Sequence, residues 1–125
     1  MKATSLKLIW VLLLTALVNV SFAGGRYADP PMNLMEVYKF AQQALEAAKA
    51  GNKDGALEAS IQGRKLAVAS FKEKSTMPMQ VAAGSLKEAI TALDAGKVDG
   101  AVPPLEHAIG KMNEEIDYYK KEGKL

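Results

Sequence analysis

The stretch Ala48-Lys49-Ala50-Gly51-Asn52-Lys53-Asp54-Gly55-Ala56 returns forty-five positions later as Leu93-Asp94-Ala95-Gly96-Lys97-Val98-Asp99-Gly100-Ala101. Each copy has the pattern of a helix end followed by a helix start. Gly51 and Gly96 follow apolar-periodic runs and supply the left-handed backbone that ends a helix. Asp54 and Asp99, three residues later, are expected to accept hydrogen bonds from the free N–H groups of the next helix. The chain is therefore predicted to consist of two helical hairpins in tandem.

The N-terminus has the features of a secretory signal peptide. A lysine-containing start precedes an apolar stretch over residues 8–18, and the small residues Ser21 and Ala23 stand at the −3 and −1 cleavage positions. A membrane-spanning helix needs about 18 to 20 apolar residues, and Asn19 interrupts this run too early. We therefore expect a signal peptide over residues 1–23, a periplasmic or secreted location, and no membrane span after cleavage.

The composition of the remaining chain excludes some partners. Residues 24–125 carry 14 basic and 14 acidic side chains, interspersed rather than in blocks, so no global attraction for nucleic acid is expected. Cysteine is absent, which excludes disulfides and thiol chemistry. One domain of 102 residues must therefore be held together by packing alone.

The first hairpin is preceded by an extended arm, predicted over residues 24–32 from its Gly, Pro and Asp content. Its first helix is predicted to begin at Asn33, where Asn33 and Glu36 fit a variant of the capping box, and to end at Gly51. The second helix is predicted from Asp54 towards Lys74. Its inner face is expected to carry the large apolar residues Leu57, Ile61, Val68 and Phe71, with the small residues Ser60, Gly63 and Ala67 between them so that a neighbouring helix can approach closely.

The second hairpin begins with a helix predicted from Thr76, as N-cap, with Pro78 in its first turn. A later start at Ser85 is the alternative, but it would leave a long unstructured connection. The fourth helix begins at Asp99 with an irregular first turn, because two prolines follow closely. Beyond them, steps of four and three place one apolar stripe in the core: Leu105, Ile109, Met112, Ile116 and Tyr119. The tail from Lys120 is expected to fray.

Four helices of similar length joined by short turns indicate an all-α fold. We predict an antiparallel up-down-up-down four-helix bundle over residues 33–122, about 30 Å long at 1.5 Å per residue. A tetratricopeptide array is the rival, but its period is about 34 residues and it needs three or more stacked units.

Three segments in this two-hairpin frame, Leu86-Lys87-Glu88-Ala89-Ile90, Gly96-Lys97-Val98 and Ala108-Ile109, carry a family resemblance. Together with the signal peptide, they resemble the small metal-binding protein family of periplasmic four-helix bundles. The resemblance implies this fold and this compartment. Members of that family are rich in His and hold divalent metals such as copper, nickel and zinc, whereas this chain has one His. No metal ligand is carried over from the resemblance.

The methionines suggest a second route to a metal. In an up-down-up-down bundle the starts of the first and third helices lie at the same end, which brings Met32 and Met35 near Met77 and Met79. Thioethers are soft ligands that select Cu(I), so these four residues are the candidate site for copper or another transition metal. The alternative is that methionine fills irregular gaps where loops meet a core.

Other chemistries lack their residues. His107 is alone, whereas zinc and copper sites usually need three or four protein ligands. Di-iron carboxylate motifs, a haem-attachment motif and a nucleophile elbow are all absent from the sequence, so we predict no enzyme. The acidic residues near the C-terminus alternate with lysines and are interpreted as a solvated face: Glu114, Glu115, Asp117 and Glu122.

The resulting functional hypothesis is a small secreted or periplasmic binding protein that binds copper-type metal ions weakly. The alternative hypothesis is a protein-protein interaction or chaperone-like helical accessory module without metal. In that case Ala-rich grooves, or a flexible arm over residues 26–32, would dock a protein partner.

Overall fold

The computed structural model describes residues 27–125, so the predicted signal peptide lies outside the described residues. This part of the chain is all-helical and contains no strand. Its elements are α2 (Leu34–Lys49), α3 (Lys53–Glu73), α4 (Met77–Asp94), the 3-10 turn η2 (Val98–Ala101) and α5 (Val102–Lys121). The predicted all-α class is confirmed. Between residues 27 and 125, no helix combines the length and hydropathy needed to cross a membrane.

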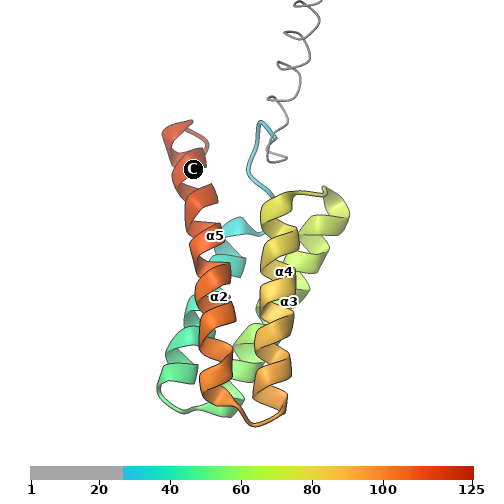
Figure 1. Ribbon diagram of the computed structural model, residues 1–125. Coiled ribbons are helices and arrows are strands. Elements are labelled where there is room, and N and C mark those ends of the chain that lie inside the picture. The colour runs from blue at the N-terminus through green and yellow to red at the C-terminus, as the bar shows by residue number, and fades with distance from the viewer. Residues whose placement is uncertain (1–26) are drawn as a thin grey trace, which may run out of the picture.

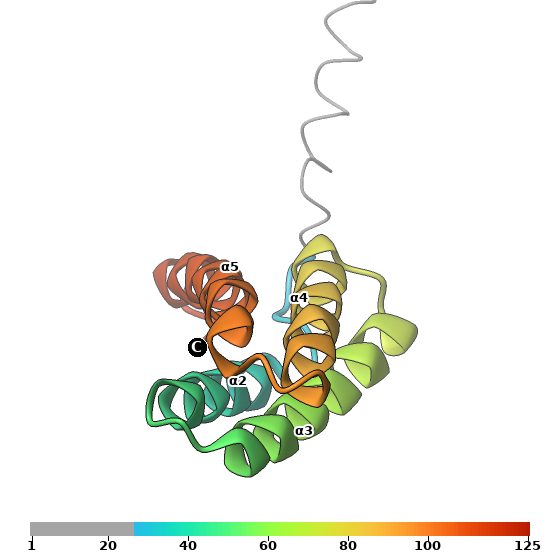
Figure 2. The same cartoon turned by 60° about the horizontal axis from the view of Figure 1, so that its bottom comes forward.

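The four long helices form a bundle in which each helix packs against two others. α2 lies against α3 and α5, and α4 lies against the same two helices (Figure 2). Figure 1 shows the α2–α3 turn and the α4–α5 connection at one end and the α3–α4 turn at the other. The core runs along the centre, and its large, fully buried side chains come from α2, α4 and α5, including Val37, Leu86, Leu93, Leu105 and Met112.

The two glycines of the repeat end their helices as predicted. Gly51 and Gly96 have φ of 76° and 77°, so each takes the left-handed conformation. In both turns the amide two residues past the C-cap donates to a carbonyl of the last helical turn, over 2.8 Å from Asn52 to Ala47 and over 2.8 Å from Lys97 to Ala92.

The C-terminus of α5 repeats this arrangement. Gly123 has a φ of 74°, and the Lys124 amide donates to the Tyr119 carbonyl over 2.8 Å. The prediction that the chain frays from Lys120 is therefore wrong. The helix ends on the same hydrogen-bonded motif as α2 and α4, and Gly123 was the signal for it.

The predicted N-cap roles of Asp54 and Asp99 are wrong. The cap of α3 is Asn52, whose Oδ1 accepts from the Gly55 amide over 3.0 Å, and Asp54 stands inside the first turn. In the second copy Lys97 occupies the position of Asn52, and its side chain has no hydrogen-bond acceptor. The chain there forms η2 before α5 begins, which confirms the irregular start that the prolines predict.

Of the other two predicted helix starts, the one at α4 is confirmed and the capping box at α2 is wrong. Thr76 is the N-cap of α4, with its Oγ1 accepting from the Met79 amide over 3.4 Å, and α4 continues through Ser85, so the longer helix is confirmed. Asn33 precedes α2 but makes no capping bond, and its φ is 66°. Its Nδ2 instead donates to the Leu66 carbonyl over 3.4 Å. The predicted capping box is wrong because this side chain joins α2 to α3.

The buried face of α3 is made of small residues, and the prediction that its large apolar residues point inward is wrong for Ile61 and Val68, whereas Leu57 and Phe71 are half-buried against the core. Its buried residues are Ala56, Ala59, Ser60, Gly63, Ala67 and Ser70. Ile61 is 37% exposed. The close approach predicted at Gly63 is confirmed, since a Cβ there would lie 3.1 Å from the Phe40 Cβ and 3.3 Å from the Leu86 Cδ1. That distance leaves no room for a large side chain, so the larger residues of α3 turn to its flank.

The stripe of α5 is buried largely as predicted. Leu105, Met112, Ile116 and Tyr119 are buried, and Ile109 is half-buried against the core. α5 therefore supplies large core side chains, whereas α3 supplies small ones.

Candidate binding surfaces

The four candidate copper ligands differ in exposure. Met79 is fully buried and Met35 is half-buried against the core, whereas Met32 is 42% and Met77 51% exposed. The starts of α2 and α4, which carry or adjoin these residues, lie at the same end of the bundle (Figure 1). Two thioethers are therefore open to solvent at this end, and the copper site stays a prediction.

Harder metal ligands do not gather on the described surface. Over residues 27–125, no group of three or more His, Cys, Asp or Glu side chains could hold a metal ion. His107 is exposed. Its neighbour Glu106 lies 3.9 Å from the Lys49 Nζ, and both side chains are more than half exposed.

The acidic residues near the end of α5 do not all lie on a solvated face. Glu114 is exposed and pairs with the Lys111 Nζ over 3.1 Å, as the alternation with lysines predicts. Glu115, however, is 3% exposed. The solvated-face interpretation is wrong for Glu115, because this position shares the buried side of α5 with Met112 and Tyr119.

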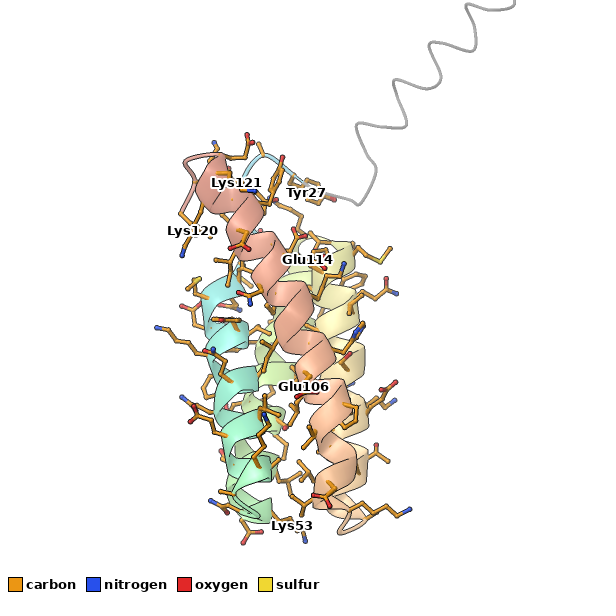
Figure 3. The ribbon with its side chains drawn as sticks, turned by 60° about the vertical axis from the view of Figure 1, so that its left-hand side comes forward. Tyr27, Lys53, Glu106, Glu114, Lys120 and Lys121 are labelled. Carbon is orange, nitrogen blue, oxygen red and sulfur yellow. The ribbon has the colours of Figure 1, made fainter. Side chains whose placement is uncertain are left out.

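The N-terminal arm is tied to the bundle over the residues that are described. The Tyr119 hydroxyl donates to the Tyr27 carbonyl over 2.8 Å, and the Tyr27 hydroxyl donates to the Ser75 carbonyl over 3.3 Å. The Lys74 Nζ lies 4.9 Å from the centre of the Tyr27 ring. Figure 3 shows Tyr27 at the end of the molecule where α5 finishes. Tyr27 therefore joins the α3–α4 turn to α5, and the prediction of a flexible arm is wrong there.

A recess of about 360 Å³ lies along α4 and the turn after it. Alanines form much of its lining, and lysines stand beside them. The Thr91 hydroxyl already donates to the Lys87 carbonyl over 3.1 Å. The lining residues are Lys87, Glu88, Thr91, Ala92, Ala95 and Lys97. They present no converging set of polar groups to orient a small ligand.

The flank of α3 carries a regular stripe of four apolar residues and one arginine that the core leaves partly open. We call this stripe the α3 seam. Its members follow steps of four and three: Leu57, Ile61, Arg64, Val68 and Phe71. Leu57 and Phe71 are half-buried against the core, whereas Val68 is half-buried outside the core cluster and Ile61 is exposed. The middle of the seam therefore faces solvent more than its ends do.

The charge beside the C-terminal half of the α3 seam is positive. Residues 64–74 contain four basic side chains and one acidic side chain. Within the described part of the chain, no ion pair involves Arg64, Lys65 or Lys72. The Nε of Arg64 is shielded from solvent and has no hydrogen-bond partner among the described residues. Because the Nε is covered, a carboxylate from a partner would pair with the two terminal nitrogens of this guanidinium.

Sequence reasoning found the four apolar members of the α3 seam and placed them in the core, and it missed Arg64. The hydropathy pattern selects the largest apolar residues of a helix, and it does not sense how closely a neighbouring helix approaches. The signal for the true arrangement was the row of small residues at similar spacing on the adjacent face.

Comparison with protein families, with characterised proteins and with solved structures found no match to this chain. The resemblance to small metal-binding proteins therefore stays a prediction.

Proposed function

We propose that this protein is an exported, non-catalytic binding module, an antiparallel up-down-up-down bundle of two tandem hairpins that presents the α3 seam to a protein partner. One observation carries this proposal: the seam is apolar and partly open, and its central Arg64 is unpaired among the described residues. Arginine is one of the residue types that are enriched among the residues that dominate binding energy at protein interfaces.

The packing of α3 supports this proposal. Ala56, Gly63 and Ala67 fill the space between α3 and its neighbours, so the fold does not use Ile61 or Val68 as central core residues. Apolar residues held at regular spacing outside the core are a feature of helix-binding surfaces.

Site-specific photo-cross-linking tests the proposal in the organism that makes the protein. A photoreactive amino acid replaces Ile61 in the full chain, and Gln43, which is exposed on α2, is the matched control position. We expect a discrete protein adduct from position 61 that is absent from position 43. No adduct from position 61, or the same adducts from both positions, would contradict the proposal.

Weak Cu(I) binding is a second candidate function, supported by the two exposed thioethers Met32 and Met77. Oxygen-free titration of the purified protein with Cu(I) tests it. We expect binding that the double substitution Met32→Leu, Met77→Leu removes and that Met112→Leu, in the buried core, leaves unchanged. An unsaturable titration of the unsubstituted protein would rule this candidate out.

A further inference from the structure

We infer that the partner of the α3 seam is an acidic amphipathic helix, an inference that rests on the proposed function and names its partner. The apolar face of this helix packs along Ile61 and Val68, and one of its carboxylates pairs with Arg64. The spacing of the seam, the charge around it and the state of Arg64 each support one part of this inference.

The spacing of the seam favours a helical partner. Steps of four and three average 3.5 residues, which is the period at which two helices keep one face in contact. The seam from Leu57 to Phe71 is about 21 Å long at 1.5 Å per residue, so a partner helix of about four turns covers it. A peptide that binds by strand addition would need a free strand edge, and residues 27–125 contain no strand.

The charge around the seam favours an acidic partner. Arg64, Lys65 and Lys72 lie on or beside the C-terminal half of the seam and are free of acidic partners within the described residues. Complementary charges at the rim of an interface raise the association rate and set the register of the two partners. Glutamates flanking the apolar face of the partner would meet these lysines.

Arg64 marks the position where the partner must carry a carboxylate. It occupies the third of five seam positions, between Ile61 and Val68, where the other members are apolar. Covering this guanidinium with an apolar side chain would remove water from a charge and leave it unpaired, which is costly. A Glu or Asp at the facing position of the partner satisfies it with a charge-assisted hydrogen bond.

The same residue disfavours a second copy of this chain as the occupant. Arg64 is the midpoint of the seam, so pairing two seams in either direction brings the two guanidiniums to facing positions. Like charges at such a position destabilise the pair.

A display library of 18-residue amphipathic helices tests the inference with the purified protein as target. Heptad apolar positions are fixed in the library, and all other positions vary freely among charged and polar residues. We expect the selected peptides to be enriched in Asp and Glu. Their binding should fall about tenfold or more with Arg64→Glu or Ile61→Asp. Lys39→Glu, the same charge reversal on the exposed face of α2, should leave it unchanged.

Exchanging the charges gives the sharper measurement. A selected peptide with Lys in place of its key carboxylate should bind the Arg64→Glu variant better than the unsubstituted protein. Thermal unfolding by circular dichroism verifies that each variant is folded before its binding is measured.

The other outcomes separate this inference from the proposed function. The selected peptides could instead be neutral or basic and still lose their binding in the Ile61→Asp variant. That result would contradict the inference that the partner is acidic, but the seam would remain a docking site. If no peptide is selected and the protein instead binds phosphatidylglycerol vesicles in a way that Ile61→Asp abolishes, the partner of the seam is a membrane and not a helix. If the protein self-associates and Ile61→Asp abolishes this self-association, the partner of the seam is a second copy of the chain. If no peptide binds through the seam, the inference is wrong, whereas the cross-link at position 61 decides the proposed function on its own.

Discussion

At the scale of single residues, a glycine with open space around it affects stability only through its backbone conformation. A Cβ added at Gly51 or at Gly84 would meet nothing within 4 Å, but Gly51 has a φ of 76° and Gly84 lies inside α4. We expect Gly51→Ala to destabilise the protein by about 1 kcal/mol, because an L side chain strains a left-handed residue. We expect Gly84→Ala to stabilise it by about 0.5–1 kcal/mol through helix propensity. Urea unfolding of both variants measures the difference, and effects of the same sign would contradict this account.

The ends of α2 and α4 could be predicted from the sequence, whereas most of the side chains that cap the helix starts could not. The glycine signal in the repeat was sufficient, because a left-handed position after a helix has few solutions other than glycine. The capping residues were harder to predict, because Asn33, Asn52, Asp54 and Asp99 all have side chains that can cap a helix. The position relative to the turn decides which of them caps a helix, and at α3 the cap is two residues earlier than predicted.

At the scale of elements, α3 is defined by how closely its neighbours approach. Gly63 packs between Phe40 of α2 and Leu86 of α4. We expect Gly63→Leu to destabilise the protein by about 1–3 kcal/mol through overpacking. The matched control is Ala69→Leu, an exposed position on the same helix, which should change stability by less than about 0.5 kcal/mol. Chemical denaturation measures both, and equal effects would show that α3 does not pack through its small residues.

The number, class and approximate bounds of the elements followed from the sequence, and the orientation of α3 did not. α5 alternates large apolar residues with charged ones, so periodicity alone places Leu105 and Met112 inside. α3 offers two stripes, one large and one small, and periodicity cannot choose between them. The choice depends on the width of the gap between helices, which is a property of the assembled bundle. The α3 seam as a site was therefore outside the reach of sequence reasoning.

At the scale of the whole molecule, the arm fastens one end of the bundle. The Tyr119 hydroxyl holds the Tyr27 backbone, and the Tyr27 hydroxyl reaches the α3–α4 turn at Ser75. We expect Tyr119→Phe to cost about 1 kcal/mol and to speed proteolysis within the arm, because it removes a hydrogen bond between distant segments. Tyr38→Phe, whose hydroxyl accepts from Gln42 of its own helix, is the control. Unchanged proteolysis of the arm in Tyr119→Phe would show that this contact does not hold it.

The proposed binding surface requires that α3 turn its small residues inward and leave Ile61 outside. Since the chain contains no cysteine, a single introduced thiol reports its own accessibility without interference. Ser60 is fully buried and Ile61, the next residue, is 37% exposed. The direct measurement is the rate at which a water-soluble thiol reagent labels Ser60→Cys and Ile61→Cys in the folded protein. We predict that Ile61→Cys reacts at least about tenfold faster, because the thiol at position 60 becomes accessible only when the bundle opens. Equal rates, or faster labelling at position 60, would contradict the orientation of α3 and the binding surface that depends on it.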